Sequence, residues 1–134
     1  MDFTYPQKVL FRHCDLAGIV FYPRYFEMIN DCVEAFFTQI GHPFEEIHTN
    51  AAVPTAQIET RFTAPSRHGD ELMLSLSVTG IGRSSLGLEV TASTAKQARF
   101  HCTSTLVYIT TQGRATPWPA DLKTAFAPYL RRPS

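Results

Sequence analysis

The sequence predicts an α+β fold in which one long central helix is wrapped by a curved antiparallel sheet of five strands. One stretch, residues 22–40, has the periodicity of a helix, and the segments after residue 54 alternate between apolar and polar residues as strands do. A wide apolar helix face and an apolar sheet face can bury each other. The 134 residues are expected to form a single domain, residues 1–134, with a core that needs no disulfides or metals.

The composition argues against several classes of function. Lysine and arginine together number 12, as do aspartate and glutamate, so no overall charge favours nucleic acid or a membrane surface as a partner. No apolar run approaches the ~20 residues of a membrane span, and residues 1–6 lack the features of a signal peptide. We therefore expect a cytoplasmic protein.

The cysteines and histidines give no sign of a metal site or a disulfide framework. The three cysteines, Cys14, Cys32 and Cys102, form no C-x-x-C pair, and an odd number is typical of reduced thiols. The five histidines are scattered and none stands at ligand spacing. We expect Cys32 and Cys102 to pack in the core, and we expect neither a metal nor a cofactor.

The first element is predicted to be a half-buried strand over residues 3–12, because its residues alternate between an apolar and a polar side. The apolar side consists of Phe3, Tyr5, Val9 and Phe11, and the polar side of Thr4, Lys8 and Arg12.

A loop at residues 15–21 leads directly into the helix, which opens at Tyr22 and Pro23. Proline suits the first helical position because its missing N–H is not needed there, and Gly41, followed by Pro43, is a stop signal. Apolar residues recur at steps of three and four and form a face wide enough to need cover on most sides. They are Tyr25, Phe26, Met28, Ile29, Cys32, Val33, Ala35, Phe36, Phe37 and Ile40.

Four strands are predicted after a polar connection that contains Pro43 and Asn50. They cover residues 54–64, 72–78, 86–92 and 98–108, and a short terminal helix follows residues 116–119. Strands of period two joined by short turns form an antiparallel meander that is apolar on one face.

The loop and the start of the helix carry a motif. Residues 15–25 read D-L-A-G-I-V-F-Y-P-R-Y, directly after the first strand. This pattern resembles hotdog-fold acyl-CoA thioesterases of the 4-hydroxybenzoyl-CoA thioesterase type. The order of one strand, one helix and four strands is also that of the hotdog fold, so the resemblance extends over nearly the whole chain.

The resemblance implies that Asp15 is the catalytic carboxylate, that Gly18 lies in the turn into the helix, and that the backbone N–H of Tyr22 holds the substrate carbonyl. Thioester hydrolysis needs a carboxylate that attacks the carbonyl or activates water, and a donor for the oxyanion. The free N–H groups and positive dipole at the start of a helix supply such a donor. The sequence leaves open whether Asp15 attacks directly or through water.

The expected substrate is a compact or aromatic acyl-CoA. Phe21 and Tyr22 resemble the aromatic-acyl thioesterases, and relatives that act on short-chain acyl-CoAs carry histidine in place of Tyr22. Phe21 is a candidate substrate-binding residue that could line an aromatic pocket, with packing in the core as its alternative. Coenzyme A phosphates favour arginine, for which Arg83, in the Gly80–Gly82 turn, and Arg67 are candidates. A solvated role in a turn is an alternative for both arginines. The identity of the acyl group, and whether CoA or an acyl-carrier protein bears it, stay open.

Other positions allow different interpretations. Asp15 alone could make an ordinary Asx turn. Cys14 and His13 could form a nucleophile pair, but adjacent residues in an extended chain point in opposite directions. Glu27 and Glu34 lie on the polar strip of the helix, where exposure to solvent is the usual role.

Two positions depart from the family pattern. His13 stands where relatives usually carry an acidic residue, and Arg24 where they usually carry asparagine. These departures bear on the local hydrogen bonding and on the substrate.

Two other functions are compatible with the fold. One is a non-catalytic acyl-CoA or acyl-carrier-protein binding module, and the other is a hotdog dehydratase or hydratase, although no segment matches the histidine–carboxylate motifs of the latter. We expect at least a homodimer, and a homotetramer built as a dimer of dimers, because an open sheet has edges that need cover. The resemblance implies sheets joined edge to edge.

Overall fold

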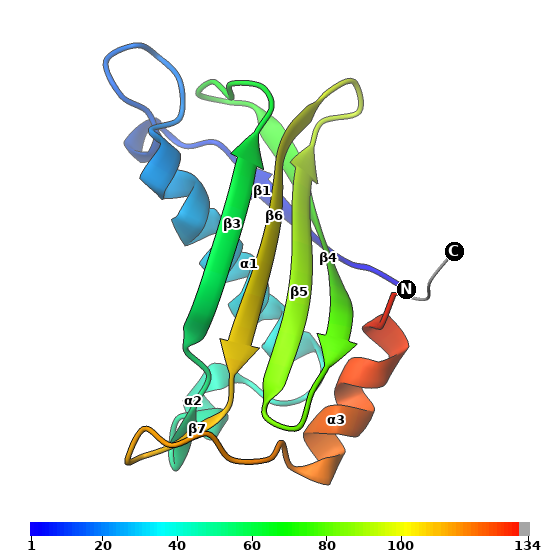
Figure 1. Cartoon of the computed structure of the whole chain (residues 1–134). Helices are drawn as coiled ribbons and strands as arrows, with labels where there is room; N and C mark the ends of the chain where they lie inside the picture. The colour runs from blue at the N-terminus through cyan, green and yellow to red at the C-terminus, as the bar shows by residue number, and fades with distance from the viewer. Residues whose placement is uncertain (132–134) are drawn as a thin grey trace.

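The computed structural model describes residues 1–131 and has a mixed α+β fold (Figure 1). Five strands form one antiparallel sheet in the order β1-β4-β5-β6-β3, as the alternating pattern predicts. The strands are β1 (Phe3–Lys8), β3 (Thr55–Phe62), β4 (Glu71–Ile81), β5 (Ser85–Ser93) and β6 (Ala98–Val107).

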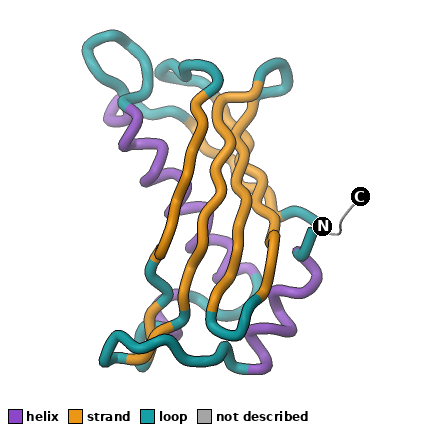
Figure 2. Tube along the Cα trace, viewed as in Figure 1, coloured by secondary structure: helices purple, strands orange, loops and turns teal. Residues whose placement is uncertain are grey.

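The helices lie on one side of this sheet and at one end of it (Figure 2). The principal helix, α1, crosses one face of the sheet, and α3 packs near the lower end in the view of Figure 1. The remaining elements are short. They are α2 (Phe44–Ile47), α3 (Ala120–Phe126), the 3₁₀ turns η1 (Phe11–His13) and η2 (Ala127–Tyr129), and the paired strands β2 (Ala51–Ala52) and β7 (Ile109–Thr110). Helix α1 itself spans Tyr22–Gln39.

The core lies between α1 and the inward-facing residues of the sheet. The helix buries seven side chains there, and alternate residues of β4, β5 and β6 meet them. The seven are Tyr25, Met28, Ile29, Cys32, Val33, Phe36 and Phe37. Burial of Cys32 raises the pKa of its thiol to about 12, in keeping with the predicted packing role.

The expectation of a central helix wrapped on most sides is wrong. Helix α1 has 18 residues and is covered by the sheet on one face, while Glu27, Asp31 and Glu34 on its other side are exposed. Charged residues recur there at helical spacing and leave that side of the helix to solvent. Besides the sheet, the end of the helix has further cover, where Phe36 and Phe37 pack against Phe126 of α3.

The strand predicted for residues 3–12 ends at Lys8, and Phe11 is 79% exposed in η1. The reason is pairing: Lys8 faces Glu71, the first residue of β4, so no strand remains for later residues to join. Val9, which is buried, bonds instead to the turn before β4, where its N–H donates to Asp70 O.

Strand β3 is an edge strand and is more exposed than the alternating pattern predicts. It pairs with β6 on one side only, and Ile58 and Phe62, which lie on the apolar face predicted for residues 54–64, are each 42% exposed. The polar connection predicted before it contains the short helix α2 and the strand β2.

Within residues 1–131, no helix is both long and apolar enough to cross a membrane. In the same part of the chain, no three histidine, cysteine, aspartate or glutamate side chains are grouped as metal ligands would be.

Candidate active site

Asp15 stands at the start of a tight loop that leads into α1. Cys14 pairs with Val20 across the base of this loop, and the N–H of Asp15 donates to Ile19 O at 3.0 Å. The N–H of Gly18 donates to Asp15 O at 3.0 Å, and Gly18 has φ +81°, in the left-handed region that favours glycine. The motif glycine therefore shapes the turn. We call residues 14–20 the aspartate loop.

The carboxylate of Asp15 is exposed and only half engaged. Its Oδ1 accepts the N–H of Ala17 at 2.9 Å, which is an Asx turn. Its Oδ2 accepts no hydrogen bond from residues 1–131. Asp15 thus makes the turn of an ordinary loop aspartate through Oδ1, while its Oδ2 is open to a water or a substrate.

His13 closes the base of the aspartate loop. The residue is 2% exposed, its Nδ1 accepts the N–H of Leu10 at 2.8 Å, and its backbone oxygen accepts the N–H of Phe21 at 2.9 Å. The thiol of Cys14 is directed to Leu10 O at 3.7 Å. No hydrogen bond joins the His13 and Cys14 side chains in the described chain, which argues against a Cys14–His13 nucleophile.

At the start of α1, one backbone donor is left over. The first four N–H groups of a helix have no partner within it. Here the N–H of Phe21 donates to His13 O, Pro23 has no N–H, and the N–H of Arg24 donates to Phe21 O at 2.8 Å. The N–H of Tyr22 has no acceptor among residues 1–131. The cap residue Phe21 offers no side-chain acceptor, so this single donor stands at the positive end of the helix.

The turn at residues 64–70 lies beside the aspartate loop and supports it. The N–H of Val20 donates to Ser66 O at 2.8 Å, and Ile19 pairs with Arg67. Ser66 is fully buried, and its Oγ accepts the hydroxyl of Tyr25, on α1, at 2.8 Å. The loop, the turn and the helix are therefore bonded together.

Arg99 on β6 anchors this turn from beneath. Its Nη1 donates to Asp70 Oδ2 at 2.8 Å, to Ser66 Oγ at 3.0 Å and to Pro65 O at 3.1 Å. The N–H of Arg67 also donates to Asp70 Oδ2, and these two bonds lower the pKa of Asp70. Sequence reasoning missed this network, because an arginine between Ala98 and Phe100 gives no sign that it is buried.

A groove of about 570 Å³ is lined in part by Tyr22, at the start of α1. Its lining is mostly apolar, and two tyrosines meet Phe62 across it: the Tyr22 and Tyr25 rings lie 6.2 and 5.5 Å from the Phe62 ring. The lining residues are Ile19, Val20, Tyr22, Tyr25, Phe62, Thr63, Ala64 and Pro65. Phe21 does not line the groove but is 48% exposed, with its ring 5.6 Å from that of Tyr22.

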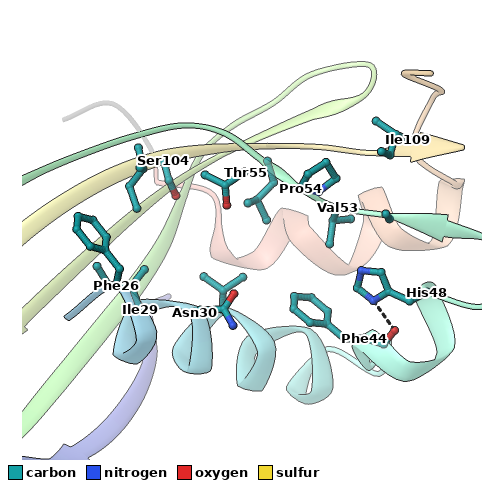
Figure 3. Close-up of a pocket in the computed structure, with 14 residues that line it drawn as sticks. Phe26, Ile29, Asn30, Phe44, His48, Val53, Pro54, Thr55, Ser104 and Ile109 are labelled. Carbon is teal, nitrogen blue, oxygen red and sulfur yellow. Dashed lines mark hydrogen bonds between the residues drawn. The ribbon is translucent and has the colours of Figure 1, made fainter. Parts of the chain in front are cut away.

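A second cavity, of about 390 Å³, begins one turn further along α1 and lies between that helix, α2 and β3 (Figure 3). Its wall is apolar except for a few groups, including Asn30 on α1 and the buried Ser104 on β6. The ring of Phe26, at the near end, lies 6.3 Å from Phe62 of the groove. His48 donates through Nδ1 to Phe44 O at 2.7 Å at the far end.

The other residues singled out in the sequence lie apart from Asp15 or are paired. Arg83 is in the turn between β4 and β5, at the opposite end of the sheet from the aspartate loop (Figure 1). One chain therefore does not bring Arg83 and Asp15 together. Glu27 is paired with Arg24 at 2.7 Å, and Glu34 is exposed.

Comparisons with known proteins give one consistent result. A family model described as the thioesterase-like superfamily matches residues 9–126. A curated relative, the 1,4-dihydroxy-2-naphthoyl-CoA hydrolase of Synechocystis, is 27% identical over 79 residues, which are 58% of this chain and 57% of the relative. The match thus spans little more than half the length of that relative.

Solved structures share the fold over nearly the whole chain. A 1,4-dihydroxy-2-naphthoyl-CoA thioesterase from Synechocystis has a TM-score of 0.88 at 23% identity, covering 95% of this chain and 96% of that one. A gentisyl-coenzyme A thioesterase has a TM-score of 0.83 at 27% identity, covering 92% and 98%. A protein from Staphylococcus aureus solved in complex with CoA has a TM-score of 0.91 at 18% identity, covering 100% and 89%. The hotdog fold is thereby confirmed.

Proposed function

The chain belongs to the thioesterase-like superfamily, and we propose that it hydrolyses acyl-CoA thioesters to a free acid and coenzyme A. In this proposal Asp15 is the catalytic carboxylate and the N–H of Tyr22 is the oxyanion donor. The observation that carries it is the hydrogen-bond accounting at the start of α1. Every other N–H in the first turn is bonded or absent, and the one that remains belongs to Tyr22, a residue that lines an apolar groove.

The chemistry follows from these two groups. A thioester carbonyl that accepts the Tyr22 N–H is polarised by that bond and by the helix dipole, more strongly as negative charge develops on its oxygen. Asp15 then either attacks the carbonyl carbon or removes a proton from an attacking water. The C–S bond breaks, and the sulfur of coenzyme A takes up a proton that comes from the water, directly or through Asp15. After a direct attack the acyl group is held by Asp15 as an anhydride, which a water then cleaves, so in both routes water supplies the oxygen of the new acid.

We further propose that the acyl group is aromatic or otherwise compact. Three aromatic rings border the groove, and planar rings pack well against such surfaces at these separations. The cavity behind Phe26 offers Asn30 and Ser104 as hydrogen-bonding groups for a polar ring substituent. The names of two relatives specify aromatic acyl groups, which supports the same substrate class.

We also propose that the protein is at least a homodimer. Strand β3 has an unpaired edge, and Ile58 and Phe62 are exposed beside it. Pairing of two β3 edges would cover these side chains and bring a partner close to the groove. Light scattering at micromolar concentration should return at least twice the 15.0 kDa of one chain. A monomer would contradict the proposal.

The function is tested by thiol release from benzoyl-, hydroxybenzoyl-, phenylacetyl-, butyryl- and palmitoyl-CoA. We expect Asp15→Asn to lower turnover by about 10²–10⁴, the range for a positioned base. The fold should survive, because the asparagine oxygen can still accept the Ala17 N–H. Cys14→Ala is the control that stays active. Turnover by Asp15→Asn equal to wild type would remove Asp15 from its role, and a kcat/KM highest for palmitoyl-CoA would remove the compact substrate class.

One observation favours a different function. The Asx turn of Asp15 is the arrangement of an ordinary loop aspartate, which suits a module that binds acyl-CoA without hydrolysing it. The same assay separates the two: such a module binds the thioester in calorimetry but releases no thiol above the background rate.

A further inference from the structure

His13 joins three parts of the site through its own atoms. Its N–H donates to Leu10 O at 3.0 Å, its Nδ1 accepts the Leu10 N–H at 2.8 Å, and its backbone oxygen accepts the Phe21 N–H at 2.9 Å. Cys14 and Asp15 follow it directly in the chain. A shift of His13 would therefore move the aspartate on one side and the start of α1 on the other.

The bond to Leu10 fixes the protonation state of the ring. A backbone N–H can only donate, so Nδ1 must be the acceptor, and the single ring proton of a neutral histidine must sit on Nε2. Uptake of a second proton places an N–H on Nδ1, where it faces the N–H of Leu10. The bond is then lost and two donors face each other in a site that is 2% exposed.

The surroundings do not favour a positive charge on this ring. Burial lowers its pKa, Arg12 on η1 and Arg24 on α1 lower it further, and Glu27 and Asp31 on α1 only partly oppose them. Across the aspartate loop, Asp70 is already bound to a buried arginine of β6. The neutral form is thus the one that the fold holds.

We propose that His13 is the positioning residue of this site, and that its neutral ring holds the base of the aspartate loop against the start of α1. This inference rests on the proposed function. In that function His13 does not contact the substrate. It acts through Asp15 and Tyr22, whose relative position depends on the hydrogen bonds that His13 accepts from the N–H groups of Leu10 and Phe21.

The consequence is a loss of activity and of stability on the acid side. The pKa of His13 in the folded chain is lowered from its ordinary value of 6.5, so between the two values the unfolded chain binds more protons. The stability that neutral His13 gives to the fold is therefore complete above pH 6.5 and is lost as the pH falls through the pKa of His13 in the folded chain. Once the ring is protonated, kcat/KM should fall by about tenfold per pH unit.

The test compares His13→Asn with His13→Leu. The asparagine Oδ1 stands as many bonds from Cα as Nδ1 does, so it can accept the Leu10 N–H but cannot take up a proton. Leucine keeps the bulk and removes the acceptor. His68→Asn is the matched control, since His68 is exposed in the neighbouring turn and makes no side-chain hydrogen bond within residues 1–131.

We expect His13→Asn to keep the neutral-pH kcat within a few-fold and to extend the plateau of kcat/KM to lower pH. His13→Leu should lower kcat at every pH without a matching change in KM, and His68→Asn should leave the profile in place. An acid limb that His13→Asn does not move would overturn the proposal.

A second measurement does not depend on activity. Nitrogen-15 spectra should show Nδ1 without a proton at neutral pH, and the amide signals of Leu10, Asp15 and Tyr22 should titrate together with the ring in wild type but not in His13→Asn. A proton on Nδ1 at neutral pH, or amide signals that do not titrate with the His13 ring, would overturn the positioning role. If no variant releases thiol at any pH, the proposed function fails while these spectra still decide the role of His13.

Discussion

The two ends of α1 are built in opposite ways. At the carboxyl end Gly41 has φ +88°, its N–H donates to Thr38 O, and the N–H of His42 donates to Phe37 O. These are the two bonds of a Schellman motif, which satisfies the last carbonyls of a helix. At the amino end the N–H of Tyr22 has no acceptor within residues 1–131.

This difference teaches where the helix is closed for stability and where it is left open. A serine or aspartate at the cap typically stabilises a helix by about 0.5–2 kcal/mol, yet the cap here is phenylalanine. No acidic residue stands in the first turn to offset the positive end. The amino end thus lacks a side-chain cap and an acidic first turn at the point where the proposed function needs a donor.

Among changes at the two ends of α1, the largest expected effect comes from removing that donor. Tyr22→Pro deletes the N–H and nothing else from the backbone, since proline is accepted in the first turn of a helix. Phe21, with φ −71° and ψ 123°, already has the extended conformation that a residue before proline prefers. We expect kcat to fall by about 10²–10³, the usual effect of losing one oxyanion donor.

The control for Tyr22→Pro is Tyr22→Ala, which also loses the ring but keeps the N–H. Loss of the Tyr22 ring removes part of the groove wall and should weaken substrate binding, which raises KM more than it lowers kcat. If both variants lose kcat equally, the ring and not the N–H is what matters, and the open amino end has no catalytic meaning.

A matched pair of glycines sharpens the comparison further. Gly18 and Gly41 have φ values of +81° and +88°, and a methyl added at either would meet no atom within 4 Å. Alanine at each should therefore cost only backbone strain, about 1–2 kcal/mol of unfolding free energy by denaturant titration. We expect Gly18→Ala to lower kcat as well and Gly41→Ala to leave it unchanged. A loss of kcat in Gly41→Ala would mean that the two ends are coupled.

Much of the fold could be predicted because its signals are local. Helical periodicity and Gly41 predict a helix over residues 22–40, and the helix observed is Tyr22–Gln39. Features that depend on which strands pair with one another could not be predicted. Phe11 follows the strand pattern but is exposed, since β4 begins at Glu71 and offers no pairing beyond Lys8.

The candidate site divides in the same way. Asp15, Gly18 and Tyr22 are adjacent in the chain and form a motif, whereas Arg99 acts on Ser66 from a distant strand. Arg99 and Phe100 are consecutive and both buried, which breaks the alternation of a strand. A register shift where β5 pairs with the start of β6 accompanies this break, and a bulge of that kind leaves no mark in the sequence.

The smallest expected effect concerns coenzyme A and the two ends of the sheet. Arg67 lies beside the aspartate loop and Arg83 at the far end, yet both are candidates for the phosphates. We expect Arg67→Ala and Arg83→Ala each to raise KM by about two- to fivefold with kcat unchanged, since ion pairs exposed to solvent are weak and a phosphate contact is the same in the ground state and the transition state. The wild-type KM should rise with salt, and less so in each variant.

If Arg83 does contact the substrate held by Asp15, we expect it to come from a second copy, because the two residues of one chain lie at opposite ends of the sheet. Hybrids of Asp15→Asn and Arg83→Ala chains test this point. When Arg83 acts across the interface, the hybrid contains a site with both an intact Asp15 and an intact Arg83, and KM returns to the wild-type value. A hybrid whose active sites all keep the raised KM would place Arg83 on the same chain as its Asp15, and an unchanged KM in Arg83→Ala itself would leave that arginine an ordinary solvated turn residue.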